Sequence, residues 1–128
     1  MKSVERIVSI RGAITVKENS VKEIKNATKI ILSEILKRNK LDKSKVINII
    51  FTVTDDLNLV NPATIAREEF KLYTTPMLCL QEMKVKGSLK KCIRMMVTTY
   101  INLYKNKILH IYLGKAEGLR PDLSQYVQ

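Results

Sequence analysis

A single long amphipathic helix is the feature that most constrains the fold of this chain. Ser20 and Glu23 match a capping box, in which the serine side chain accepts a hydrogen bond from a free amide at the helix start. Apolar side chains then recur at helical spacing, at Val21, Ile24, Ala27, Ile31, Leu32, Ile35 and Leu36. We therefore expect a helix from Ser20 to about Asn39, with one apolar stripe that packs against another layer.

The other apolar segments have the composition of β-strands. Residues 46–54 are rich in β-branched side chains and almost continuously apolar, as in a strand covered on both faces. Further strands are predicted at residues 7–16, 77–82, 89–100 and 108–113. A strand at 89–100 would place Lys90, Cys92, Arg94 and Met96 on one face, although a helix remains possible there.

A second, short helix is predicted after the loop at residues 55–60. Asn61 is a suitable cap and Pro62 a suitable first helical residue, so the helix should run through Phe70. Strands combined with one long and one short helix indicate an α+β fold, in which a mixed, mostly antiparallel sheet packs on the helices. The length allows one domain, residues 1–128, with a mostly irregular segment from Gly114 and a flexible tail at Ser124–Gln128.

One face of the predicted sheet has no partner within the chain. The long helix covers one face, yet the strands are apolar on both sides. Such a sheet favours an oligomer in which the uncovered faces pack together. The periodicity of the sequence does not give the number of subunits.

The net charge of +11 requires an explanation, because basic proteins often bind nucleic acids, anionic membranes or anionic small molecules. The 23 basic side chains are spread along the whole chain, and the few aromatic residues do not alternate with them. Neither a basic tail nor a stacking platform for single strands is present. We expect no nucleic-acid partner, and a lysine-rich surface explains most of the charge.

Other site classes are disfavoured by composition. Cys79 and Cys92 are the two cysteines and His110 is the single histidine, so no metal-binding spacing is evident. The first residues lack the apolar core of a signal peptide, and no apolar segment approaches the length of a membrane span. We expect a cytoplasmic protein with no membrane partner.

Four short motifs resemble those of the monofunctional trimeric chorismate mutases. They are IRGA at 10–13, CLQEM at 79–83, LKKCIR at 89–94 and LRPDL at 119–123, in the order and near the spacing of that family. The resemblance implies a homotrimer with a barrel-like core and active sites in the clefts between subunits. It also implies isomerisation of chorismate to prephenate, for phenylalanine and tyrosine synthesis, without metal, cofactor or covalent intermediate.

Carried onto the matching positions, the resemblance implies that Arg94 and Glu82 are catalytic. An ether bond breaks while a carbon–carbon bond forms, so a fixed guanidinium beside the ether oxygen would stabilise the growing negative charge. Glu82 would accept a hydrogen bond from the ring hydroxyl of the substrate and hold Arg94 in place. The residues implied in substrate binding are Arg11, Arg67, Cys79, Tyr112 and Arg120.

The substrate explains why several arginines are needed. Chorismate carries two carboxylates, which Arg11, Arg67 and Arg120 are suited to bind in bidentate fashion. Each implied residue also has an ordinary structural role: an arginine in a surface ion pair, a small buried thiol, or a tyrosine ring packed on the sheet. Strand geometry adds a difficulty for Cys79 and Glu82, since residues three apart face opposite sides. A bulge or the end of the strand must bring both to one pocket.

Two positions depart from the family pattern. Asn61 stands where relatives tend to have an aromatic residue, and Thr64 where they tend to have lysine. We expect normal chemistry with weaker substrate binding. The alternative functions are a relative of the same architecture that acts as an imine or enamine deaminase or binds an anionic metabolite, and a basic RNA-binding protein, whose affinity would fall steeply with salt.

Overall fold

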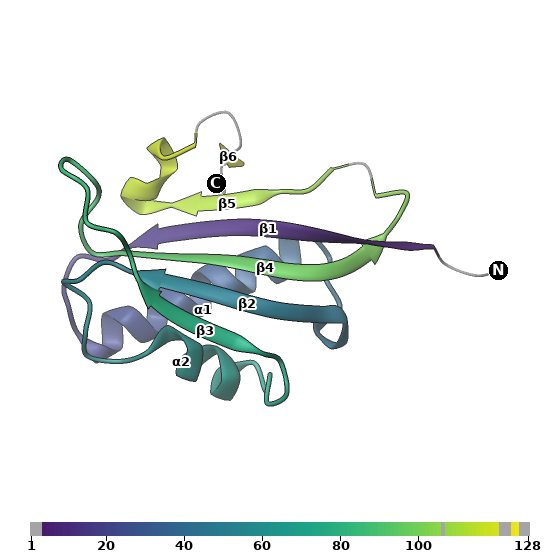
Figure 1. Ribbon diagram of the computed structural model, residues 1–128, viewed down its shortest axis with the longest axis horizontal. Coiled ribbons are helices and arrows are strands. Elements are labelled where there is room, and N and C mark those ends of the chain that lie inside the picture. Colours follow the sequence, from purple (N-terminus) through teal and green to yellow (C-terminus); the bar gives the residue numbers. More distant parts are fainter. Residues whose placement is uncertain (1–3, 106, 121–123, 126–128) are drawn as a thin grey trace.

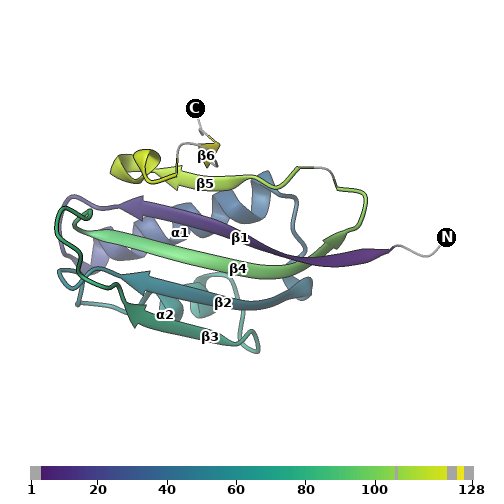
Figure 2. The ribbon, with the colours of Figure 1, turned by 45° about the horizontal axis from the view of Figure 1, so that its top comes forward.

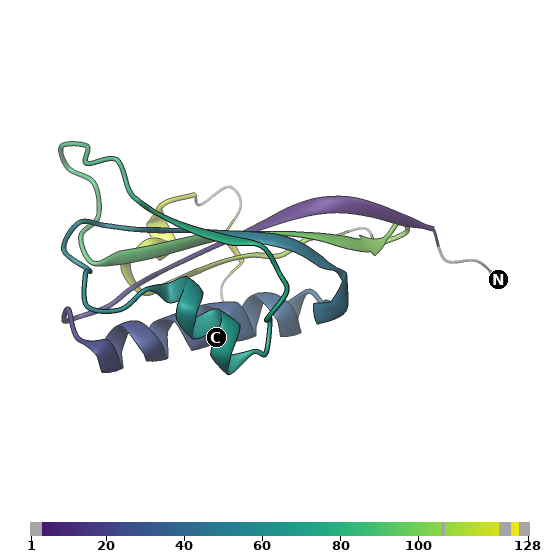
Figure 3. The same cartoon turned by 60° about the horizontal axis from the view of Figure 1, so that its bottom comes forward.

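The computed structural model describes residues 4–105, 107–120 and 124–125, and shows a six-stranded sheet with both α-helices on one side (Figures 1 and 3). The α-helices are α1 (Val21–Arg38) and α2 (Pro62–Glu69). The strands are β1 (Glu5–Thr15), β2 (Val46–Val53), β3 (Met77–Gln81), β4 (Cys92–Asn102), β5 (His110–Leu113) and β6 (Ser124–Gln125). Two 3-10 helices, η1 and η2, span Lys43–Lys45 and Gly114–Gly118.

The sheet is mixed, with antiparallel strands at its centre and parallel strands at its edges. The strand order is β3-β2-β4-β1-β5-β6, most of which is visible in Figure 2. β1 and β4 pair antiparallel from Glu5 opposite Asn102 to Thr15 opposite Cys92, and β2 pairs antiparallel with the other side of β4. β3, β5 and β6 each run parallel to a neighbour. The predicted antiparallel character therefore holds for the central strands and not for the edges.

Helix α1 forms where its sequence predicts. The Ser20 hydroxyl accepts a hydrogen bond from the Glu23 amide at 3.0 Å, and Asn39 caps the other end. The apolar stripe of the helix is fully buried against the sheet, at Ile24, Ile31, Leu32 and Ile35. Burial of four such side chains contributes roughly 1.5 to 3 kcal/mol each, which is why this face determines how the helix docks.

Gly12 marks the closest approach between α1 and the sheet. A Cβ atom at Gly12 would lie 2.6 Å from Cδ1 of Ile35 and 3.0 Å from Cγ1 of Ile31. A larger residue would therefore displace the Ile35 and Ile31 side chains and disturb the packing of α1 on β1. Because consecutive strand residues alternate, the adjacent Arg11 lies on the opposite face of the sheet.

That opposite face, here called the open face, carries neither α-helix (Figure 3). Several large apolar side chains on it are exposed: Ile7, Leu78, Leu80 and Tyr100. One end of the face is covered by η2, whose Ala116 packs with Ala13, Cys92 and Tyr112. The rest of the open face has the apolar character of a surface that packs against another layer.

Several predicted boundaries are wrong; β1, for example, begins at Glu5 and not at residue 7, and β4 ends at Asn102 and not at residue 100. β4 begins at Cys92 and not at residue 89, so Lys90 lies outside the strand, and the alternative helix does not form. The cause is Lys91, whose φ of 49° is left-handed and interrupts the extended chain. β5 begins at His110 and not at residue 108. The segment predicted as irregular contains η2 and β6, while the end of the predicted tail, residues 126–128, lies outside the described residues.

Candidate active site

A cavity of about 500 Å³ lies on the open face, beside η2. Segments that are far apart in the sequence meet around it: β1, β2, β4, β5, the residue after β3 and the segment after η2. The polar side chains around it are Arg11, Thr52, Glu82, Arg94, Tyr112 and Arg120, and apolar ones include Ile50, Met96 and Leu119. Five of the seven site residues predicted from the sequence are thus brought together.

Arg94 lies on β4, directly opposite Thr52 of β2 and Ala13 of β1. Its Nε is 3.7 Å from Oε1 of Glu82, which makes an ion pair but is too long for a hydrogen bond. The same Nε is buried and has no hydrogen-bond partner within the described residues. A buried donor without a partner is unfavourable, so this group is well placed to donate to a ligand in the cavity.

Glu82 reaches the cavity because strand alternation places it on the open face, together with Leu78 and Leu80 of β3. Its backbone amide still donates to the Val53 carbonyl at 2.7 Å, which holds the residue beside β2. The Thr52 hydroxyl donates to Oε2 of Glu82 at 2.5 Å. One carboxylate oxygen is therefore held by the threonine, while the other faces Arg94.

Cys79 and Arg67 do not line this cavity. Cys79 pairs with Phe51 in register, and both pack into the core on the helix side of the sheet. Arg67 is exposed on α2, which lies on that same side (Figure 3). The expected conflict between positions 79 and 82 is thus real: strand alternation holds through Glu82, so Glu82 faces the cavity and Cys79 faces the core.

Neither cysteine has the character of a nucleophile. Burial raises the pKa of the Cys79 thiol. Burial also raises the pKa of Cys92, although the positive charge of Arg94 acts in the opposite direction. Both thiols are free and favour the protonated form, which reacts poorly. The cysteines therefore shape the protein interior.

His110 is part of the site region and was not singled out from the sequence. Its Nδ1 accepts a hydrogen bond from the Arg11 backbone amide at 3.0 Å. Burial, followed by the charges of Arg11 and Arg120, lowers the pKa of His110. The ring is therefore neutral near pH 7 and supports β1 at the position of Arg11. The single histidine of the chain was the available signal, but only metal binding was considered for it.

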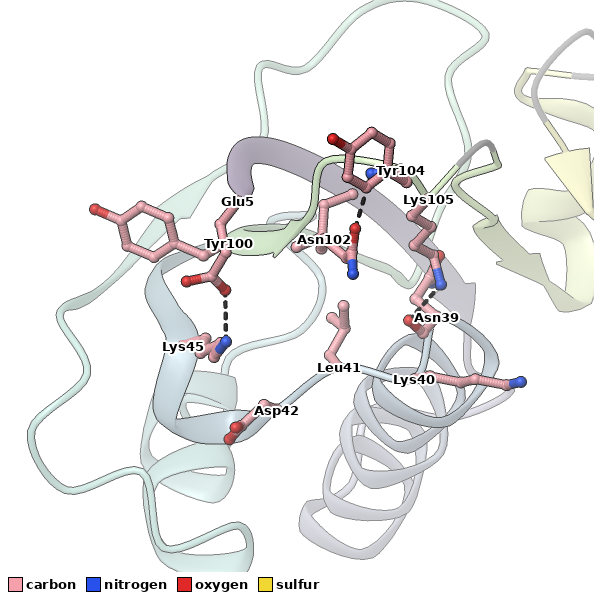
Figure 4. A pocket seen from close by; sticks show the side chains of 11 residues that line it. Glu5, Asn39, Lys40, Leu41, Asp42, Lys45, Tyr100, Asn102, Tyr104 and Lys105 are labelled. Atoms are coloured by element: carbon pink, nitrogen blue, oxygen red, sulfur yellow. Dashed lines mark hydrogen bonds and ion pairs between the residues drawn. The ribbon is translucent and has the colours of Figure 1, made fainter. Parts of the chain in front are cut away.

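A second hollow, the terminal hollow, lies at the other end of the β1–β4 pair (Figure 4). Its volume is about 450 Å³, and its lining includes Glu5, Asn39, Lys45 and Lys105. These groups bind one another: Lys45 Nζ lies 2.5 Å from Glu5, and Lys105 Nζ donates to the Asn39 carbonyl at 2.7 Å. Two lysines of this hollow, Lys45 and Lys105, are thus engaged in internal contacts.

The chemistry available in the cavity is that of fixed charges. Within the described ranges, no three His, Cys, Asp or Glu side chains are grouped so as to hold a metal ion. No described helix is long and apolar enough to cross a membrane. Three guanidinium groups, one carboxylate and one phenol surround the space. Such a set suits an anionic ligand that also carries a hydroxyl group.

Comparison with known proteins shows the family to which this arrangement belongs. The model for "Chorismate mutase type I" matches residues 7–123, nearly the whole chain. The chain belongs to this family. The predicted enzyme class, an isomerase of the chorismate mutase type, is thereby confirmed, and a deaminase or a metabolite-binding relative is not favoured.

Individual family members agree over most of their length. Chorismate mutase AroH of Bacillus subtilis (strain 168) is 42% identical over 118 residues, which cover 92% of this chain and 93% of the relative. Chorismate mutase AroH of Thermus thermophilus is 37% identical over 115 residues, with 89% and 93% covered. A solved chorismate mutase structure from Clostridium thermocellum matches with a TM-score of 0.79 and 42% identity, covering 86% of this chain and 97% of that one. The mixed sheet with two helices is therefore the fold of this family.

Proposed function

We propose that the cavity converts chorismate to prephenate, and that Arg94 supplies the main electrostatic contribution. The supporting observation is the Arg94–Glu82 ion pair inside a cavity that also presents Arg11, Tyr112 and Arg120. As the ether bond of chorismate breaks, its oxygen becomes more negative. A guanidinium beside that oxygen stabilises the transition state more than the bound substrate, which is the condition for acceleration.

Glu82 has two tasks in this proposal. One carboxylate oxygen stays near Arg94 and keeps the guanidinium oriented, at 3.7 Å from Nε. The carboxylate also accepts a hydrogen bond from the ring hydroxyl of the substrate. The Thr52 hydroxyl holds Oε2 from behind, so the carboxylate keeps its orientation without a ligand. No proton has to move during the rearrangement.

The remaining cations and the phenol would bind the two substrate carboxylates. Arg11 and Arg120 approach from β1 and from the segment after η2, and Tyr112 offers a hydroxyl from β5. Carboxylates fixed at two points hold the substrate folded, with its reacting carbons close together. A millionfold acceleration, the low end for enzymes, requires roughly 8 kcal/mol. Conformational restriction and Arg94 together would supply it.

We propose further that the protein works as a cytoplasmic homotrimer with a barrel-like core of packed sheets. The exposed apolar residues of the open face support packing between copies. Arg67 is exposed and Cys79 is half-buried on the edge strand β3, so a neighbouring copy could present both to the cavity of the first. Light scattering tests the assembly: a mass of three 14.7 kDa chains is expected, and a stable monomer would contradict it.

The reaction is tested by incubating the purified protein with chorismate and identifying the product by chromatography against a prephenate standard. Arg94→Ala should reduce kcat about 100-fold to 1000-fold, because removal of one donor to a developing oxyanion has effects of that size. Arg38→Ala is the matched control, since Arg38 is exposed and pairs with Glu34 on α1. Wild-type protein that binds chorismate unchanged would refute the reaction. Equal turnover by Arg94→Ala would refute the role of Arg94.

A further inference from the structure

Asp56 lies behind the cavity, in the turn after β2, and binds the start of β4. Its Oδ1 accepts the Thr54 hydroxyl at 2.5 Å, and the Lys91 amide nitrogen lies 3.1 Å and 3.0 Å from its two carboxylate oxygens. Thr54 Oγ1 in turn accepts the Cys92 amide at 2.9 Å. The carboxylate therefore holds two consecutive amides, one directly and one through Thr54, where the chain enters β4.

The backbone held in this way has an unfavourable conformation. Lys91 has a φ of 49°, in the left-handed region that non-glycine residues avoid. Its carbonyl accepts the Val16 amide at 2.9 Å, so Lys91 is bound by the turn after β2 on one side and by the end of β1 on the other. Without the carboxylate, the Lys91 amide would lose its acceptor, and the backbone would relax towards an extended form. The start of β4 would then shift.

Such a shift would reach Arg94, which lies two residues beyond Cys92 and opposite Thr52. Glu82 is attached to the same end of β2, through the Val53 carbonyl at 2.7 Å and the Thr52 hydroxyl at 2.5 Å. The 3.7 Å between Arg94 Nε and Glu82 Oε1 is too long for a hydrogen bond. The separation of the two charged groups therefore depends on where the backbone places them.

We propose that Asp56 is a positioning residue: by fixing the entry of β4, it sets the place of the Arg94 guanidinium relative to Glu82 and to the substrate. This role rests on the proposed function, in which Arg94 faces the ether oxygen. The neighbouring Asp55 provides a contrast. It is exposed, and its carboxylate pairs with Lys84 at 3.5 Å without reaching the start of β4.

The test compares Asp56→Ala with Asp55→Ala, each in the wild-type and in the Arg94→Ala background. A misplacement of about 1 Å lowers rates by on the order of 100-fold, so kcat of Asp56→Ala should fall about 10-fold to 100-fold. KM should stay within about threefold, since Arg11 and Arg120 bind the carboxylates from other segments. Asp55→Ala should behave as wild type. In the Arg94→Ala background, loss of Asp56 should have no further effect, because no guanidinium remains to be placed.

A purely structural role predicts different results. Wild-type kcat for Asp56→Ala, or a loss that multiplies with that of Arg94→Ala, would overturn the proposal. If Asp56→Ala does not fold, Asp56→Asn decides, because its NH2 group replaces one of the two oxygens that face the Lys91 amide, and two donors there repel each other. A lower kcat for Asp56→Asn that disappears with Arg94→Ala supports the role, and an unchanged kcat overturns it. Failure of the wild type to form prephenate is a separate outcome, which refutes the proposed function itself.

Discussion

Two hollows of similar size lie at opposite ends of the β1–β4 pair, about 500 Å³ for the cavity and about 450 Å³ for the terminal hollow. In the terminal hollow, Lys45 and Lys105 bind Glu5 and the Asn39 carbonyl (Figure 4). In the cavity, Arg94 Nε is buried and has no hydrogen-bond partner among the residues that the structure describes. Full internal pairing indicates a structural role, whereas a buried guanidinium nitrogen with an unmade hydrogen bond indicates a place for a ligand.

Among the variants that compare the two hollows, the largest effect is expected from Asn39→Ala in the terminal hollow. The buried Asn39 side chain donates to the carbonyls of Ile35 and Leu109 at 3.0 Å and 2.9 Å, and accepts the Leu109 amide at 2.8 Å. Leaving these groups unpaired should lower the free energy of unfolding by about 3 kcal/mol. Urea denaturation measures it, with the exposed Asn26→Ala on α1 as control. Unchanged stability, or a lower kcat at a temperature where the variant is folded, would contradict the structural role.

A cation from each hollow gives the next comparison. Arg11→Ala should raise KM about 30-fold, which corresponds to about 2 kcal/mol for lost hydrogen bonds to a charged carboxylate. Lys45→Ala should leave KM unchanged, because Lys45 binds Glu5, which lies at the opposite end of β1 from the cavity. Steady-state kinetics with chorismate distinguishes the two variants. If Arg11→Ala and Lys45→Ala changed KM equally, the cavity could no longer be distinguished from the terminal hollow as the place where substrate binds.

A smaller effect is expected from restoring the family pattern on α2. The double variant Asn61→Phe with Thr64→Lys should lower KM about fivefold, since one added cation contributes about 1 kcal/mol towards a dianion at a partly exposed site. The reaction rate at saturation should not change. Because α2 lies on the helix side of the sheet, tighter binding would also indicate that a neighbouring copy presents α2 to the cavity. Unchanged affinity would count against both points.

The smallest effect concerns pH. Burial and the charges of Arg11 and Arg120 lower the pKa of His110 from its ordinary value of 6.5. As the pH falls through 6.5, His110 therefore becomes protonated in the unfolded chain before it does so in the folded protein. The free energy of unfolding decreases over this range, until the pH falls below the folded-state pKa of His110. His110→Asn keeps an acceptor for the Arg11 amide but does not titrate. Its unfolding free energy should fall less than that of the wild type between about pH 7.5 and about pH 5.5.

Most of the fold follows from local sequence patterns, and its remaining features depend on contacts that are distant in the chain. The cap at Ser20 and the Asn61–Pro62 pair predict both helix starts. The parallel direction of β3 and β5 depends on how the chain crosses the sheet, which periodicity does not record. The start of β4 was misplaced because Lys91, and not a glycine, adopts the left-handed conformation.

In the site, likewise, residues that belong to a sequence motif could be predicted, whereas residues that act through a contact with the backbone could not. Arg94 and Glu82 were predicted because they belong to motifs resembling a known family, and the structure brings them together. Asp56 and His110 were missed because each acts on the site through a backbone amide, of Lys91 and of Arg11 respectively. An amide partner depends on which segments lie side by side, and the sequence does not state this directly.

Gly12 has a consequence for the design of inhibitors. Strand β1 forms the floor of the cavity, and α1 packs so closely behind Gly12 that even a methyl group would meet Ile35 at 2.6 Å. A compound that presses on this floor would have to move a buried helix. The rim is different, since Glu82 adjoins the exposed segment 83–88, and Leu119 and Arg120 follow the short 3-10 helix η2. Compounds should therefore gain selectivity by extending along the rim, and the floor should be treated as rigid.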